Sequence, residues 1–170
     1  TFHCWKEKGH GWVSLKNAMK QSCDTYFYEV ARLLGVDRLN ITAEKFGLGK
    51  KVLGDYFDNE KKGLFPNTKW KKNNLGKGWV LGETLITGIG QGYTQTTPLQ
   101  LCMMTAQIAN GGYAIKPKII VDSNPISYED AKQSMESGLL FDAGSEELLD
   151  KKLFKNPKNI KIVQEAMFAS

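Results

Sequence analysis

The residues best suited to chemistry in this chain are Ser22 and Asp24, which flank Cys23 in a tripeptide set into a predicted helical run. A hydroxyl two residues before a carboxylate can take part in proton transfer beside a nucleophile. The same pair of residue types also occurs in helix caps and solvated turns. The tripeptide alone therefore leaves a catalytic and a purely structural interpretation open.

Two residues near the N-terminus, Cys4 and His10, join Cys23 as a second group with chemical potential. Thiolate and imidazole groups of this kind supply three of the four ligands of a tetrahedral zinc site, and His3 is an alternative ligand. Two other interpretations remain open. Cys23 fits a small buried thiol, and a disulfide between Cys4 and Cys23 suits an oxidising compartment, although the chain has an odd number of cysteines, three.

The composition limits the classes of protein to consider. With 170 residues and 41% hydrophobic content, the chain is long enough for one domain with one core. It contains no run of eighteen apolar residues and no signal peptide at its start. The chain begins at Thr1 without a methionine and stops at Ser170 within a helical pattern, so we expect it to be part of a longer protein.

The net charge of +5 comes from 23 basic and 18 acidic residues, and only Arg32 and Arg38 are arginines. Base-specific readers of nucleic acid rely on arginine for bidentate contacts, so we expect no nucleic-acid partner. The lysines gather between Lys45 and Lys77. They are consistent with attraction to anionic molecules such as lipid headgroups, or with an ordinary solvated surface.

The first half of the chain predicts two helices followed by a long loop. Apolar residues recur at helical spacing from Leu15 to Leu34, after Ser14 as N-cap and before Gly35 as C-cap. A second short helix is predicted from Asp37 to Phe46. Residues 48–82 are rich in Gly, Lys and Asn and predict a loop, for which the tryptophans Trp70 and Trp79 offer anchors.

The second half predicts a glycine-rich turn between a strand end and a helix. Leu85 and Ile86 lead as a strand into the turn at 88–92, which lacks the spacing of a phosphate-binding or dinucleotide loop. The turn instead predicts close backbone packing of the strand end against the helix that follows. Thr97 as N-cap and Pro98 at the first helical position begin a helix to Ala109 that is apolar on nearly every face and is expected to be buried all round.

The C-terminal part gives a weaker pattern. It predicts a strand over 113–121 that Pro117 interrupts, an irregular segment over 122–144, and helices over 146–154 and 158–169, the second after the Asn156-Pro157 cap.

The order of the motifs carries a resemblance. Five motifs follow one another along the chain. They are Cys4-Trp5, Gly9-His10-Gly11, the helical run with its Ser-Cys-Asp tripeptide, the Gly88 to Pro98 segment, and Gly111-Gly112. Over about residues 1 to 120 this order closely resembles the transpeptidase domain of class B penicillin-binding proteins, and specifically the elongation type, penicillin-binding protein 2. The remainder is similar only loosely.

The resemblance implies a fold and an activity. The fold is α+β, with residues 1–170 forming the helical part of a serine transpeptidase and β-lactamase-like domain whose antiparallel sheet lies largely outside this segment. The activity is that of a peptidoglycan D,D-transpeptidase, which cross-links stem peptides through a serine acyl-enzyme during cell elongation and binds penicillin. The chain has no Ser-x-x-Lys and no Lys-[Ser/Thr]-Gly sequence, so the resemblance places the nucleophile upstream and the lysine-containing strand downstream.

The resemblance also implies roles for single residues. Ser22 would hydrogen-bond the lysine of the missing nucleophile motif and pass a proton to the departing D-alanine amine, and Asp24 would hold that lysine and orient the stem peptide. Many relatives have Asn where this chain has Asp24, but elongation-type members resemble it in having Asp. They also have a metal site beside this motif, to which His10 and Cys23 correspond, so the zinc would be structural and the chemistry would need no cofactor.

The implied partners are peptidoglycan stem peptides, β-lactams and membrane proteins of the elongation complex. The implied location is the periplasmic face of the bacterial inner membrane, with the anchor outside this segment. Two alternatives remain open: a β-lactamase or β-lactam sensor of the same superfamily, and a non-catalytic cell-wall scaffold. The flanking sequence would distinguish them.

Overall fold

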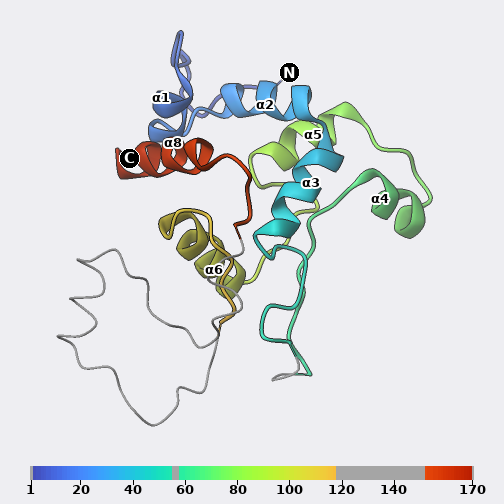
Figure 1. Cartoon of the computed structure of the whole chain (residues 1–170). Coiled ribbons are helices and arrows are strands. Elements are labelled where there is room, and N and C mark those ends of the chain that lie inside the picture. The colour runs from blue at the N-terminus through green and yellow to red at the C-terminus, as the bar shows by residue number, and fades with distance from the viewer. Residues whose placement is uncertain (1, 55–57, 118–151, 170) are drawn as a thin grey trace, which may run out of the picture.

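The computed structural model describes residues 2–54, 58–117 and 152–169, which are mostly helical (Figure 1). The helices in this part of the chain are α1 (Leu15–Lys20), α2 (Asp24–Leu34), α3 (Val36–Lys45), α4 (Thr68–Leu75), α5 (Leu81–Gly88), α6 (Pro98–Ala109) and α8 (Pro157–Phe168). Strand pairing within the described ranges consists of two isolated antiparallel bridges, Leu64 with Gln95 and Tyr113 with Lys152. The predicted helical character is therefore confirmed.

The single helix predicted over residues 15–34 is wrong, because the chain breaks it into α1 and α2. The break is a Schellman motif: the Cys23 N–H donates to the Ala18 carbonyl at 2.9 Å and the Ser22 N–H donates to the Met19 carbonyl at 3.1 Å. Ser22, in the middle of the short link between the two helices, has φ +49°, in the left-handed region. Glycine is the usual residue at this position, so hydrophobic spacing gave no sign of the break. The predicted caps at Ser14 and Gly35 are confirmed.

Helix α5 packs against α2, and the two helices approach closely at Gly88 (Figure 1). A Cβ atom at Gly88 would lie 2.4 Å from the Cβ of Ala31, which is fully buried on α2. The close backbone packing predicted for the glycine-rich segment is therefore present at Gly88, but its predicted partner, the helix that follows, is wrong, because the contact is with α2. The strand predicted at Leu85 and Ile86 is wrong, because both residues lie within α5.

Helix α3 matches the short helix predicted over residues 37–46, but the loop predicted over residues 48–82 contains α4 and the start of α5. The Asn67 side chain caps α4 by accepting from the Trp70 N–H at 2.7 Å, and Gly76 ends it with a left-handed residue. Trp70 and Trp79 do anchor this region, with ring centroids 5.2 and 6.4 Å from that of Tyr93.

A buried ion pair joins α4 to α5. The Lys71 ammonium binds the Glu83 carboxylate, and their side chains are 6% and 15% exposed. Glu83 also accepts from the Val80 N–H at 3.0 Å, which caps the start of α5, and from the Tyr93 hydroxyl at 3.4 Å. Burial raises the pKa of Glu83, but these hydrogen bonds and the Lys71 charge outweigh it, and the pKa lies below its ordinary value.

Helix α6 has the predicted bounds, with Thr97 as N-cap and Pro98 first, but the prediction that it is buried all round is wrong. Its buried residues include two glutamines, Gln100 at 0% exposure and Gln107 at 2%, while Leu101 is 44% exposed. The Gln100 side-chain amide donates to the carbonyls of Lys50 at 2.7 Å and Lys62 at 2.9 Å. The backbone beside α6 is irregular, so buried amide groups, rather than apolar side chains, satisfy its carbonyls.

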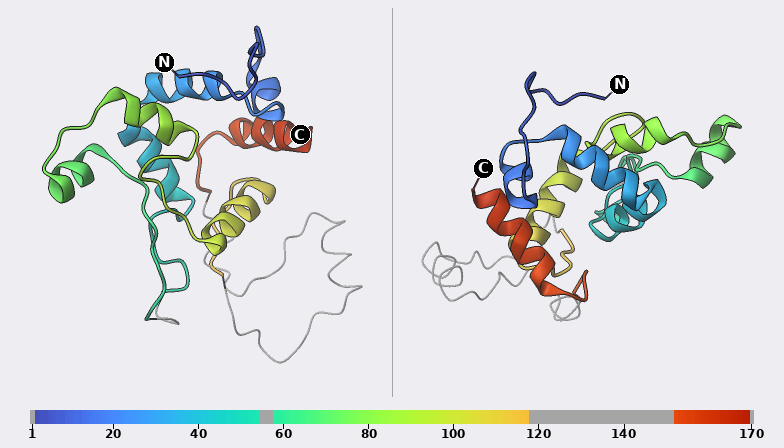
Figure 2. Two further views of the ribbon diagram at one scale, coloured as in Figure 1. Left: turned by 180° about the vertical axis from the view of Figure 1, so that it is seen from behind. Right: turned by 90° about the horizontal axis from the view of Figure 1, so that it is seen from above.

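Helix α8 lies against α1 and α6, as the two views of Figure 2 show. The Gln164 amide donates to the Ile108 carbonyl at the end of α6, at 2.7 Å. The predicted Asn156-Pro157 cap is confirmed.

Residues 152–154 form a bridge and a bend, so the end of the helix predicted over 146–154 is wrong. Of the strand predicted over 113–121, the described residues form only the bridge at Tyr113. Residues 118–121, the irregular segment over 122–144 and residues 146–151 lie outside the described ranges.

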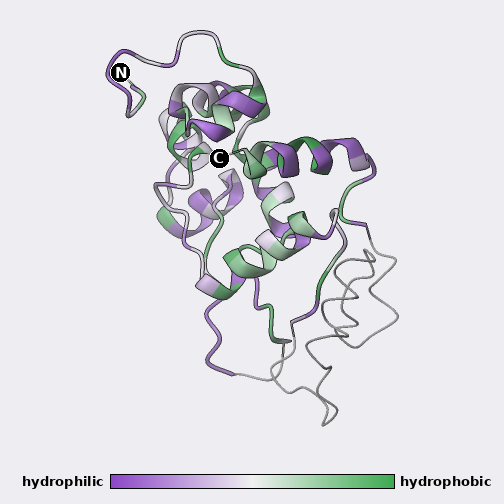
Figure 3. Ribbon diagram, turned by 90° about the vertical axis from the view of Figure 1, so that its left-hand side faces the viewer, coloured by the Kyte–Doolittle hydropathy of each residue, from purple (hydrophilic) through white to green (hydrophobic). Residues whose placement is uncertain are grey.

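Hydrophobic and hydrophilic residues alternate along most of the helices (Figure 3), as expected of amphipathic helices that each bury one face. In the described parts of the chain, none of the helices has the length and apolar character needed to cross a membrane.

Candidate functional site

The turn between α1 and α2 presents the Ser22 side chain to solvent. Ser22 is exposed, and its hydroxyl has no hydrogen-bond partner among the described residues. A left-handed backbone costs a serine about 1–2 kcal/mol relative to glycine. Such strain is found mainly where surrounding structure holds a residue for a functional reason. The arrangement thus sets the direction of the Cα–Cβ bond that carries a hydroxyl free to bind another group.

Asp24 is the first residue of α2, where the positive end of the helix dipole stabilises its carboxylate. Its Oδ2 accepts from the backbone N–H of Trp5 at 3.0 Å, and Oδ1 has no partner within the described residues. The carboxylate also acts on its surroundings, because the pKa of Tyr28 is raised by burial first and then by the negative charge of Asp24 and by Cys4. Asp24 therefore offers one free oxygen to a cation or an amide.

The structure brings Cys4, His10 and Cys23 together, and we call them the Cys–His cluster. Their ligand atoms all lie within 4.8 Å of one another, and the Cys4 Sγ is 3.4 Å from the His10 Nδ1. Ligands of a tetrahedral zinc lie about 3.6–3.8 Å apart, given metal distances of about 2.0–2.3 Å. The donor set therefore fits zinc with small adjustments. His3 is exposed and lies outside the cluster, and both cysteines are free thiols.

The surroundings of Cys4 favour its thiolate form. Burial raises the pKa of Cys4, but backbone hydrogen bonds from Lys6, Asp24 and Thr25 and one from the Cys23 thiol outweigh it and lower the pKa below its ordinary value. Zinc binds the thiolate, so this environment supports ligation.

Trp5 is a site residue that sequence reasoning missed. Its indole Nε1–H donates to the Ser22 carbonyl at 2.8 Å and, more weakly, to the Gln21 carbonyl at 3.3 Å. Its ring also meets the His10 ring edge to face, with centroids 5.5 Å apart. The signal was weak, because an exposed tryptophan in a loop has no periodic pattern that links it to a turn 17 residues away.

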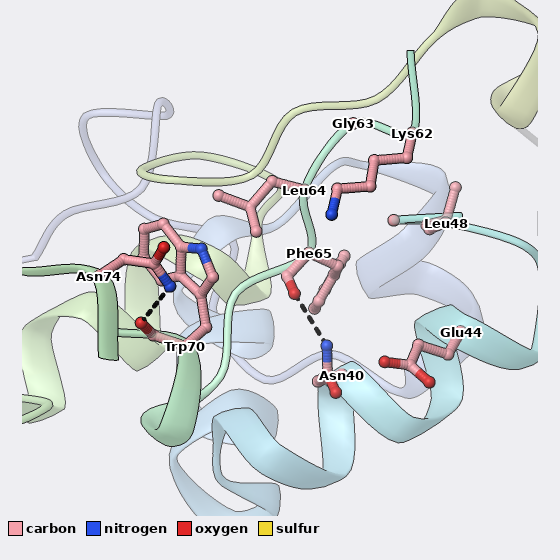
Figure 4. A pocket seen from close by; sticks show the side chains of 10 residues that line it. Asn40, Glu44, Leu48, Lys62, Gly63, Leu64, Phe65, Trp70 and Asn74 are labelled. Carbon is pink, nitrogen blue, oxygen red and sulfur yellow. Dashed lines mark hydrogen bonds between the residues drawn. The ribbon is translucent and has the colours of Figure 1, made fainter. Parts of the chain in front are cut away.

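A cavity of about 390 Å³ lies between α3 and α4 and shares no lining residue with this site (Figure 4). None of the Ser22, Asp24 or Cys–His cluster residues lines it. Two of its polar side chains are already engaged, since the Asn40 amide donates to the Phe65 carbonyl at 2.8 Å and Glu44 pairs with Lys50 at 3.2 Å. We therefore centre the candidate site on the turn at Ser22, which brings together an exposed hydroxyl, a carboxylate with one free oxygen and a donor set that could hold a metal ion.

The chain is mostly helical, and its Ser-x-Asp turn lies beside two thiols and an imidazole that could hold zinc. A family model also matches this chain. Residues 1–167 match the penicillin binding protein transpeptidase domain, so the chain belongs to that family. The resemblance predicted from the motif order is confirmed.

The sequence relatives point to one branch of the family. Peptidoglycan D,D-transpeptidase MrdA of Acinetobacter baumannii is 43% identical over 119 residues, which is 70% of this chain and 18% of that protein. MrdA of Escherichia coli K12 is 36% identical over 129 residues, 76% of this chain and 20% of that protein. The chain thus spans about a fifth of the length of these relatives.

Solved structures agree with the sequence comparison. PBP2 of Pseudomonas aeruginosa, in complex with WCK 5153, is 38% identical with a TM-score of 0.76, and the match covers 98% of this chain and 34% of that one. PBP2 of Helicobacter pylori, in complex with MreC, is 28% identical with a TM-score of 0.77, covering 99% of this chain and 27% of that one. The fold is therefore that of part of a PBP2 transpeptidase domain.

Proposed function

We propose that the chain forms part of a peptidoglycan D,D-transpeptidase that cross-links stem peptides through a serine acyl-enzyme during cell elongation and is acylated by penicillin. Residues 1–170 are then one portion of a single transpeptidase domain, and the nucleophilic serine and its lysine come from outside it. The names of the relatives support this activity over a β-lactamase, a β-lactam sensor or a scaffold.

In this proposal Ser22 and Asp24 are the second group of catalytic residues. Acyl transfer from a D-alanyl-D-alanine end expels an amine, which leaves only if its nitrogen receives a proton. The free Ser22 hydroxyl can accept a proton from a lysine and donate its own to that nitrogen. The free Asp24 Oδ1 can hold the lysine ammonium or accept from an amide of the stem peptide.

The Cys–His cluster is proposed to hold a structural zinc, with a fourth ligand from outside this segment. The metal would supply no step of the reaction and would fix the N-terminal loop against the turn at Ser22, because Cys23 lies between Ser22 and Asp24. The donor types, their spacing and the lowered pKa of Cys4 support this assignment.

The proposed partners are stem peptides, β-lactams and membrane proteins of the elongation complex, and the proposed location is the periplasmic face of the inner membrane. The P. aeruginosa PBP2 complex with WCK 5153 and the H. pylori PBP2 complex with MreC support inhibitor and elongation-protein binding, respectively.

The observation that carries the proposal is the left-handed Ser22, which exposes an unpartnered hydroxyl two residues from a half-free carboxylate in a chain of this family. The test is the rate at which a fluorescent penicillin acylates the intact protein. Ser22→Ala and Asp24→Ala should each slow acylation by about 10²-fold or more, the scale expected for losing a proton-transfer group.

The matched control is Glu29→Ala, which removes an exposed carboxylate from the same helix as Asp24 but one paired only with Arg32. It should acylate at the rate of the unmodified protein. Rates near that of the control in either Ser22→Ala or Asp24→Ala would remove that residue from the catalytic machinery.

A further inference from the structure

Trp5 contacts both proposed catalytic residues through separate groups. Its indole N–H donates to the Ser22 carbonyl at 2.8 Å, and its backbone N–H donates to the Asp24 carboxylate at 3.0 Å. Among the described residues, no other residue is hydrogen-bonded to both Ser22 and Asp24. The contact joins the N-terminal loop to a turn 17 residues further along the chain.

The indole bond acts at the strained point of the turn. Ser22 has φ +49°, and the orientation of its carbonyl is set by the remaining backbone torsion of the same residue. A donor fixed on that carbonyl therefore holds the torsion, and with it the direction in which the Cα–Cβ bond carries the hydroxyl. Without it, an exposed serine in the left-handed region is free to relax toward a less strained backbone conformation.

The backbone bond acts on the carboxylate. By occupying Oδ2 of Asp24 it fixes the plane of the group and leaves Oδ1 as the oxygen available to a partner. The Trp5 ring in turn rests against the His10 ring, with centroids 5.5 Å apart. The N-terminal loop, the Asp24 carboxylate and the Ser22 backbone are thus held by the Trp5 side chain and its own amide.

The Trp5 side chain is 67% exposed, so it buries little apolar surface. Its contribution to stability is small compared with its contribution to geometry, because a displacement of about 1 Å at a reacting group costs about 10²-fold in rate. We infer that Trp5 is a positioning residue that sets the direction of the Ser22 hydroxyl and the Asp24 carboxylate. This inference rests on the catalytic roles proposed above for those two residues.

The test uses Trp5→Phe, which keeps an aromatic ring beside His10 but removes the indole donor. Trp12→Phe is the matched control, since Trp12 lies in the same loop and is fully exposed. The dependence of labelling rate on fluorescent penicillin concentration separates the acylation rate constant from the binding constant. In the intact protein, Trp5→Phe should lower the acylation rate constant by about tenfold or more, with the binding constant and Tm close to those of Trp12→Phe.

A second variant separates loss of the N–H donor from the smaller ring of phenylalanine. Replacing Trp5 site-specifically by β-(3-benzothienyl)alanine substitutes sulfur for the indole N–H with the ring system kept, and should reproduce the loss of rate. Acylation by either Trp5 variant at the rate of Trp12→Phe would overturn the inference. A weaker binding constant with an unchanged rate constant would also overturn it, since it would make Trp5 a substrate contact.

A structural readout separates this inference from the proposed function. The amide nitrogen of Cys23 shares a peptide group with the Ser22 carbonyl, so its ¹⁵N resonance in protein labelled selectively at cysteine should shift in Trp5→Phe and not in Trp12→Phe. A shift without loss of rate refutes the positioning role and leaves the roles of Ser22 and Asp24 to their own variants. An unshifted resonance means that the indole bond is absent, and the inference fails even if Ser22→Ala is inactive.

Discussion

Replacing Ser22 by glycine should make the protein more stable and less active at once. The left-handed conformation of Ser22, with φ +49°, costs a residue with a Cβ about 1–2 kcal/mol that glycine does not incur. Glycine also raises the entropy of the unfolded chain, which costs about 0.4–1 kcal/mol. The difference predicts that Ser22→Gly gains about 0.5–1 kcal/mol of stability.

The matched variant is Ser22→Ala, which also removes the hydroxyl but keeps the Cβ and therefore the strain. It should be no more stable than the unmodified protein. At about 2–4 °C of Tm per kcal/mol, the scale for about 150–250 residues, Ser22→Gly should melt about 1–4 °C higher. In both variants, acylation by penicillin should be slower than in the unmodified protein by about 10²-fold or more.

Thermal unfolding followed by differential scanning calorimetry and labelling by a fluorescent penicillin measure the two quantities on the same samples. A Ser22→Gly variant less stable than Ser22→Ala would refute the left-handed assignment. A Ser22→Gly variant that acylates normally would refute the use of the hydroxyl.

Three further predictions concern the framework around the site. Gln100→Leu should destabilise the protein by about 3 kcal/mol, because two buried carbonyls lose their hydrogen-bond donor. The control variant Gln91→Leu, at an exposed site, should change the denaturation midpoint little. Glu83→Gln should cost about 2–3 kcal/mol at pH 7 by leaving Lys71 buried without its partner. The folded pKa of Glu83 is lowered, so its stabilisation is complete above its ordinary value of 4.5 and is lost as the pH falls below it. The Tm difference from the unmodified protein should therefore shrink below pH 4.5. The intact protein purified without chelator should contain about one zinc per chain, and removing it should lower Tm by about 5–10 °C if free zinc was about 100-fold above its Kd.

Each of these predictions has a result that contradicts it. Equal midpoints for Gln100→Leu and Gln91→Leu would mean that the two hydrogen bonds from the Gln100 amide contribute nothing to stability. A Tm difference for Glu83→Gln that stays constant from pH 7 to pH 3 would mean that the ion pair does not act through its charge. Metal-free protein whose Tm ignores chelator would leave the Cys–His cluster as ordinary thiols and an imidazole.

Local signals in the sequence predicted the helices whose ends are marked by side chains. Thr97-Pro98 and Asn156-Pro157 begin α6 and α8 as expected, because an N-cap followed by proline satisfies exposed amides and fixes the first helical φ. The elements that were missed have weaker local signals. Helix α4 is rich in lysine and asparagine with little apolar periodicity, and Leu85-Ile86 in α5 favours a strand by composition.

The site was predictable in part for a related reason. The motif order indicated Ser22 and Asp24, and residue types indicated the Cys–His cluster that the fold brings together. The break at Ser22 was not predictable, because serine in a left-handed position gives no sequence signal where glycine would. Trp5 was not predictable either, since its importance depends on contacts that cross the turn.

The proposed role of Ser22 in protonating the leaving amine is tested most directly by changing the leaving group. An amine must be protonated to depart, whereas a thiolate of low pKa departs without a proton. In the intact protein, Ser22→Ala should slow acylation by a D-alanyl-D-alanine peptide by about 10²-fold or more. It should slow acylation by the corresponding thioester by less than about tenfold. Equal losses for the amide and the thioester would contradict the account, because Ser22 would then act before the leaving group departs or only on the structure of the turn.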